Sequence, residues 1–127
     1  MTIKWSIDPA RCRMTVTCSD VVTVADVFAL FDAVVVEGAL PFGKVVDMND
    51  ARSALTGEDM QLIGARVQAY SRHMTEPMGP LAIVARSAKD QSQAQLFATL
   101  AQGRRPIEIF SSVRAAEDWL DRQEPKL

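Results

Sequence analysis

Lys44-Val45-Val46-Asp47-Met48 is the first of three short apolar runs that decide the fold of this 127-residue chain. The other two are Leu81-Ala82-Ile83-Val84-Ala85 and Ile107-Glu108-Ile109-Phe110. Each run ends in small polar residues and is followed by a helical pattern of apolar positions. This repeated strand-then-helix order predicts a mostly parallel sheet covered by helices, because parallel strands need a crossover connection. Open sheets of this kind bind ligands at the carboxyl ends of their strands.

The first eighteen residues predict an antiparallel hairpin ahead of the parallel strands. Apolar residues alternate with polar ones from residue 3 to 7 and again from 12 to 18, and Asp8-Pro9-Ala10-Arg11 between them has turn chemistry. We expect Cys12 and Cys18 to be buried apolar side chains of the second strand. They lie too far apart along that strand to form a disulfide with each other.

Helix start signals follow the strands at four places. The signals are Thr23 with Asp26, Thr56 with Asp59, Ser87 or Asp90, and Ser112. The sequence therefore predicts one α/β domain over residues 1–127. Its fold class is a mostly parallel five-stranded sheet, opened by an antiparallel hairpin, with about four helices.

Composition excludes several classes of function. A net charge of −2 argues against an electrostatic nucleic-acid interface. No stretch approaches the roughly 20 apolar residues that span a bilayer, and the first residues show no signal peptide. We therefore expect a cytoplasmic protein that has no membrane span and does not bind nucleic acid.

Polar residues that follow the predicted strands form the candidate site. They are Asp47, Asn49, Asp50, Arg52, Ser53, Thr56, Arg86 and Ser87. We expect residues 47–56 to form an irregular loop whose carboxylates could hold a divalent cation or a phosphoryl group. Thr56 could accept phosphate at a helix N-terminus, where the dipole favours negative charge. The alternative is an ordinary solvated loop in which Thr56 only caps its helix.

No catalytic set is evident, and we expect neither a metal nor a cofactor. An aspartyl-phosphate receiver would need an acidic pair where Asp20 stands alone and a lysine where Ser111-Ser112 stand. His73 is expected at a helix end, and a single histidine with two separated cysteines makes no zinc spacing. Gly103-Arg104-Arg105-Pro106 could contact a carboxylate or phosphate, although a solvated turn is the favoured interpretation.

Two apolar patterns leave alternatives open. One set could line a lipid or isoprenoid pocket or simply form the core: Phe28, Phe31, Met60, Met74, Met78 and Trp119. A second run is too continuous for one buried face, and predicts burial on two sides or a homodimer contact: Val34, Val35, Val36, Ala39, Leu40 and Phe42.

The order of elements resembles the SpoIIAA-like fold of STAS domains, and looks most like the small bacterial proteins grouped as STAS/SEC14 or SpoIIAA-like. Val45-Val46-Asp47-Met48 followed by Leu55-Thr56-Gly57 looks like the strand-Asp, then Asp-Ser-x-Gly, segment of anti-sigma-factor antagonists. The stretch from Ile107 to Leu120 is similar to the strand-then-helix ending of that group. In the antagonists a partner kinase phosphorylates the helix-start serine and so toggles binding, and this position falls on or near Thr56.

Three hypotheses of function follow. The first is a non-enzymatic regulatory or protein-interaction module that binds an unidentified protein partner through residues 47–57, with Thr56 as candidate phosphoacceptor. The second, implied by SEC14-type kinship, is a small apolar-ligand (lipid-like) binding protein. The third and weakest is an enzyme of unknown reaction.

Overall fold

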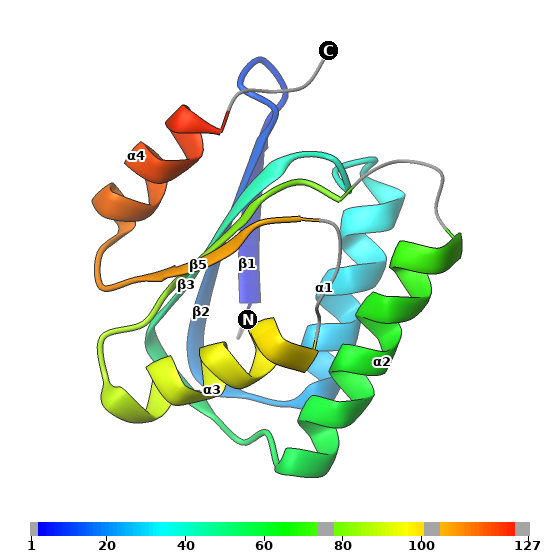
Figure 1. Ribbon diagram of the computed structural model, residues 1–127, viewed down its shortest axis with the longest axis vertical. Helices are drawn as coiled ribbons and strands as arrows, with labels where there is room; N and C mark the ends of the chain where they lie inside the picture. Colours follow the sequence, from blue (N-terminus) through cyan, green and yellow to red (C-terminus); the bar gives the residue numbers. More distant parts are fainter. Residues whose placement is uncertain (1–2, 74–77, 101–104, 124–127) are drawn as a thin grey trace.

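The computed structural model describes residues 3–73, 78–100 and 105–123, which form a five-stranded mixed sheet and four helices (Figure 1). The strands are β1 (Ile3–Asp8), β2 (Arg13–Val22), β3 (Gly43–Ser53), β4 (Leu81–Val84) and β5 (Ile107–Phe110). The helices are α1 (Val24–Val36), α2 (Gly57–His73), α3 (Ala88–Leu100) and α4 (Val113–Arg122). β1 pairs with β2 antiparallel and the other neighbours are parallel, in the order β1-β2-β3-β4-β5. The predicted fold class is confirmed.

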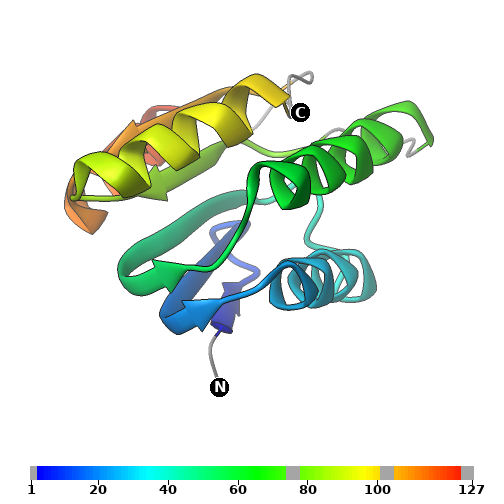
Figure 2. The same cartoon turned by 90° about the horizontal axis from the view of Figure 1, so that it is seen from below.

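Three helices cover one face of the sheet and the fourth covers the other (Figures 1 and 2). From β2 to β5 the strands advance in one direction across the sheet. Right-handed crossovers in a sheet that advances one way place every connecting helix on the same face, which explains the position of α1, α2 and α3. No strand follows α4 within the described residues, so α4 is free to pack on the opposite face, against β3, β4 and β5.

The expected helix starts are confirmed by their hydrogen bonds. Thr23 and Asp26 form a reciprocal capping box at α1, and Ser112 caps α4 by accepting from the backbone N–H of Ala115. Ser87 accepts from Asp90 N–H at the start of α3. These local bonds position the helix ends that follow the strands.

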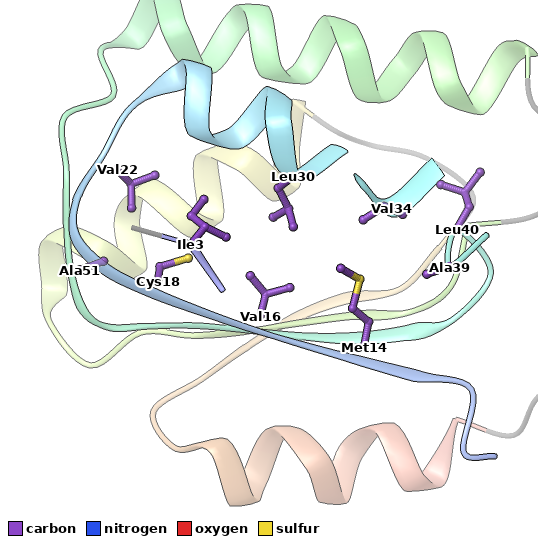
Figure 3. Packing of buried hydrophobic residues seen from close by; sticks show 10 residues of the cluster. All are labelled: Ile3, Met14, Val16, Cys18, Val22, Leu30, Val34, Ala39, Leu40 and Ala51. Atoms are coloured by element: carbon purple, nitrogen blue, oxygen red, sulfur yellow. The ribbon is translucent and has the colours of Figure 1, made fainter. Parts of the chain in front are cut away.

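The core has two parts, one on each side of the sheet. Under α1, inward side chains from β1 and β2 pack with residues from the helix, as Figure 3 shows: Ile3, Met14, Val16, Cys18, Val22, Leu30, Val34, Ala39, Leu40 and Ala51. Under α4, a second cluster joins β3 and β4 to the helix: Val45, Ala82, Val84, Ala116 and Leu120. On the face opposite α4, Leu81 and Ile83 of β4 pack with Ala94 of α3. β3 and β4 are therefore covered on both faces, which explains why their sequence reads as continuous apolar runs.

Two sequence predictions are wrong. Residues 47–53 are not an irregular loop, because β3 continues to Ser53 and pairs with β2 along this stretch. The register shifts between Thr17 and Ser19 of β2, opposite Asp47 and Asp50, so a bulge resets the alternation of inward and outward side chains. Cys12 is exposed in the turn at a φ of 49°, whereas Cys18 is buried; both are free thiols.

Candidate functional site

The carboxyl half of β3 carries most of the candidate site. β4 ends at Val84, opposite Asp47, so the part of β3 beyond Asp47 pairs only with β2 in the described part of the chain. Asp47 Oδ1 accepts from the backbone N–H of Asn49 at 3.0 Å and so braces the bulge. Asp50 and Arg52 are exposed. We call residues 47–57 the rim segment.

Thr56 stands at the exposed start of α2 and is held by a capping box. Its Oγ1 accepts from the backbone N–H of Asp59, and its own N–H donates to Asp59 Oδ2, both at 3.0 Å. Ser53 supports the turn before it, because Ser53 Oγ accepts from Leu55 N–H at 3.2 Å. The hydroxyl of Thr56 therefore lies at a helix N-terminus, next to the carboxylate of Asp59.

Arg86 and Ser87 form a separate group after β4. Arg86 is exposed, and its Nε donates to the carbonyl oxygen of Ser111 at 3.3 Å, which ties it to the end of β5. Ser87 caps α3. In the described part of the chain no hydrogen bond or ion pair joins these two residues to Asp47 or Thr56, so the structure divides the predicted site into two groups.

Three of the polar candidate residues do not converge on a cavity. Asp47, Arg86 and Ser87 line neither of the two apolar cavities described below nor the open groove beside α3. Among residues 3–73, 78–100 and 105–123, no group of three or more His, Cys, Asp or Glu side chains could hold a metal ion. His73 ends α2, and Arg104 lies outside the described residues.

An apolar cavity of about 130 Å³, which we call the large cavity, lies between the sheet and α1, α2 and α3. Leu30, Phe31, Val46, Met48 and Phe97 are among its lining residues. Leu55 of the rim segment also lines it, and Asp90 and Gln93 are its polar groups. Cys18 lines it as well; burial, with Asp47 and Asp26 nearby, raises the pKa of this thiol to about 11. Phe31 and Met60, which the sequence offered as pocket residues, do line this cavity. Trp119 belongs to α4 and packs against the cluster on the other face of the sheet.

A second cavity of about 60 Å³, the small cavity, lies at the amino ends of the parallel strands. Two cationic side chains line it, Lys44 and Arg105. Lys44 is only 6% exposed, and its Nζ donates to the carbonyl oxygens of Leu40 and Phe42, both at 2.8 Å. Burial, and next the charge of Arg105, lower the pKa of Lys44 to about 7.

Arg105 is not the side chain of a solvated turn, contrary to the sequence interpretation. Its Nε is buried without a hydrogen-bond partner in the described residues, and its Nη1 reaches Gly79 O only at 3.5 Å. Sequence reasoning missed Lys44 altogether. The signal was present, because Lys44 shares strand parity with Val46 and Met48, so a regular β3 places this cation on an inward face.

In the described part of the chain, no helix is both long and apolar enough to cross a bilayer. No protein-family model matches the sequence, and no curated protein matches it significantly. Solved structures do resemble it. An uncharacterized protein of the DUF3478 family from Shewanella loihica PV-4, described as having a SpoIIAA-like fold, superposes with a TM-score of 0.63 at 14% identity over 93% of each chain.

A second similar structure is an anti-sigma factor antagonist from Mycobacterium paratuberculosis. Its TM-score is 0.58 at 14% identity, over 94% of each chain. Both likenesses extend over nearly the whole chain. This chain therefore has the SpoIIAA-like fold of STAS domains, as its order of elements predicts.

Proposed function

We propose that this chain is a non-enzymatic regulatory module of the cytoplasm that binds a protein partner through the rim segment. The observation that carries the proposal is the exposure of Asp50, Arg52 and Thr56 together on one short segment, from the carboxyl end of β3 to the start of α2. Fold likeness to an anti-sigma factor antagonist supports a regulatory role of this type. Exposed charged and hydroxyl groups on a rigid strand end are suited to recognising a protein surface.

A charge-matched pair of triple variants tests this proposal. Asp50→Asn, Arg52→Gln and Thr56→Ala alter the rim, while Glu37→Gln, Lys89→Gln and Thr99→Ala alter exposed residues elsewhere. We expect host proteins that bind the wild type and the second variant specifically to be lost by the rim variant. The affinity of one such purified partner is then measured by calorimetry. Equal affinity for both variants would remove the rim from the interface.

Thr56 is our candidate for a phosphorylation switch at this surface. A phosphate on Oγ1 adds about −1.5 to −2 charges beside Asp59 and Glu58. The helix N-terminus favours that charge, but the two carboxylates repel it, so we expect the capping box to open. Intact mass spectra of protein purified from its own host should show a phosphate-sized increment that is absent from Thr56→Ala; an increment retained by that variant places the modification elsewhere.

The second candidate function is binding of a small apolar ligand in the large cavity. Its support is the volume of about 130 Å³ and the almost wholly apolar lining. An engineered apolar cavity of about 150 Å³ binds benzene, so a ligand body with a single ring fits. Paired native and denaturing mass spectra should show an adduct that is lost on denaturation. A bare mass under native conditions, with an empty organic extract, would count against this candidate.

A homodimer remains part of the proposal. Val36 is 82% exposed and Val35 39% exposed at the end of α1, whereas Val34 beside them is buried. Two adjacent exposed valines at a helix end could pack against the same residues of a second copy. Analytical ultracentrifugation over a range of concentrations tests this contact.

A further inference from the structure

Two cations share the small cavity, and no carboxylate of the described residues lies there to neutralise them. Among the described residues no Asp or Glu lines this cavity, and neither Lys44 nor Arg105 forms an ion pair with one of them. Arg13, which is also buried, does form such a pair, with Asp121 at 2.9 Å. The two unpaired cations are unusual because buried charges are normally paired or neutralised.

Hydrogen bonding at this end of the fold is incomplete. A protonated lysine has three N–H donors, and Leu40 and Phe42 accept two of them. The buried Nε–H of Arg105 has no acceptor in the described part of the chain. Lys44 alone could be explained by a structural role, in which its hydrogen bonds hold the loop after α1 in place. That role accounts neither for the second cation nor for the cavity that both side chains line, whereas an anion with two oxygens would satisfy the open donors of both.

The small cavity adjoins the large one. Four residues line both cavities: Leu30, Phe31, Val46 and Leu81. Lys44, Val46 and Met48 share strand parity on β3, and the four-residue step from Lys44 to Met48 spans roughly 13 Å. Charge differs between the two ends, because Asp90 lines the far part of the large cavity while the cations lie in the small one. An anionic group is therefore attracted to the Lys44 end and repelled from the other.

We propose that the two cavities together bind a small amphipathic carboxylate, with its carboxylate between Lys44 and Arg105 and its apolar body in the large cavity. The inference rests on the second candidate function and gives the ligand its chemical class and its orientation. A body of about one six-membered ring on a short arm suits the volume of the large cavity. An apolar pocket with a few convergent polar groups is the usual form of a small-molecule site.

Three probes and calorimetry at pH 7 test the proposal. The probes are 3-phenylpropionate, the neutral 3-phenylpropan-1-ol, which keeps the ring and arm, and acetate, which keeps only the carboxylate. We expect 3-phenylpropionate to bind about tenfold or more tightly than the alcohol, because charge-assisted hydrogen bonds exceed neutral ones by that margin. We also expect it to bind more tightly than acetate, because acetate buries no ring in the large cavity. Equal binding of the alcohol would overturn the carboxylate site and leave the apolar-ligand function standing. Binding of acetate as tight as that of 3-phenylpropionate would overturn the two-cavity assignment. No binding by any probe at millimolar concentration would overturn both.

Variants locate the binding site. Lys44→Met and Arg105→Met each remove one cation from the small cavity, and Lys89→Met removes the same charge from the exposed face of α3. We expect the first two to lose about tenfold in affinity for 3-phenylpropionate and to keep their affinity for the alcohol, while Lys89→Met matches the wild type. Circular dichroism establishes that each variant is folded. If Lys44→Met does not fold, the affinity of Arg105→Met for 3-phenylpropionate is the deciding measurement. A folded Lys44→Met or Arg105→Met variant that binds 3-phenylpropionate as tightly as the wild type would overturn the proposal.

Proton uptake supplies an independent readout. Arg105 and Tyr70 are the other ionisable side chains that line the small cavity in the described residues. With a pKa of about 7, Lys44 is mostly neutral at pH 8, and a bound carboxylate raises that pKa. Calorimetry in two buffers of different ionisation enthalpy should therefore show protons taken up with 3-phenylpropionate by the wild type and by Lys89→Met. Uptake that persists undiminished in Lys44→Met would overturn the role of Lys44.

Discussion

The two ends of β3 place charged residues in opposite surroundings. At the carboxyl end, Asp50 and Arg52 are exposed, and water solvates their charges. At the amino end, Lys44 is buried against two carbonyl oxygens beside a second cation. Water compensates the first group at little cost, whereas the second group carries an unfavourable desolvation energy that the fold retains. The difference teaches that a charged side chain is the stronger indication of a binding site when it is buried and water does not stabilise its charge.

The large cavity connects these two regions. Leu55 of the rim segment lines one part of it, and it shares lining residues with the small cavity that Lys44 and Arg105 reach. Gln93 of α3 lines the same cavity and donates from Nε2 to Leu55 O at 3.3 Å. A ligand that fills the cavity would thus contact the backbone support of the rim, so the two proposed functions share structural elements.

Backbone packing gives the largest expected difference between the ends. A Cβ added at Gly79, near Lys44, would overlap the carbonyl of Phe42, which is backbone and cannot move aside. A Cβ at Gly57, in the rim segment, meets nothing within 4 Å. We expect Gly79→Ala to lower the free energy of unfolding by about 4 kcal/mol, and Gly57→Ala to leave it unchanged or raise it by up to about 1 kcal/mol. Urea denaturation measures both; equal stabilities would show that the amino end is loosely packed.

The pH dependence of stability should single out Lys44. Its pKa in the folded protein, about 7, lies below its ordinary value of 10.5, so the unfolded chain binds this proton more tightly. Stability from this group is therefore lost as the pH falls from 10.5 to 7 and changes little below that. Between pH 7 and 9.5 we expect the wild type to gain about 3 kcal/mol relative to Lys44→Met, at about 1.36 kcal/mol per pH unit. Lys89→Met should follow the wild type throughout, and parallel curves for wild type and Lys44→Met would contradict the lowered pKa.

Sequence reasoning predicted the fold well because its signals are local. Alternating residues, turn chemistry and the caps at Thr23, Thr56 and Ser112 act within a few residues, and the structure confirms them. Residues 47–53 were missed because Asp and Asn disfavour strands locally, and only the distant partner β2 supplies their pairing.

For the candidate site too, local signals in the sequence could be predicted and tertiary contacts could not. The exposed rim residues could be predicted because they follow apolar runs in the sequence. Lys44 and Arg105 could not be brought together in this way, because they lie on different strand ends and meet only through the tertiary fold. Their burial depends on α1, α2 and the neighbouring strand, and no short pattern records those contacts.

Two equivalent caps separate stability from recognition at the rim. Thr23 and Thr56 form the same capping box on α1 and α2, with Asp26 and Asp59. We expect Thr23→Ala and Thr56→Ala each to cost about 1 kcal/mol of unfolding free energy. Only Thr56→Ala should weaken the binding of a partner captured through the rim segment, as measured by calorimetry at a temperature where both variants are folded. Equal weakening by both would mean that the loss reflects stability and not contact.

The smallest effect on stability is expected at Val36, and for that reason it tests the homodimer cleanly. Val36 is 82% exposed, so Val36→Glu removes little buried area and should change the unfolding free energy of the monomer by less than about 0.5 kcal/mol. A dimer that packs through the end of α1 would, however, bury two like charges and dissociate. Sedimentation should then show a monomer for Val36→Glu at concentrations where the wild type is dimeric. Leu62→Glu, an exposed substitution on α2, is the control and should leave the dimer intact. If Val36→Glu sediments as the wild-type dimer does, the contact lies on another surface. If both proteins are monomeric, the end of α1 is simply solvated.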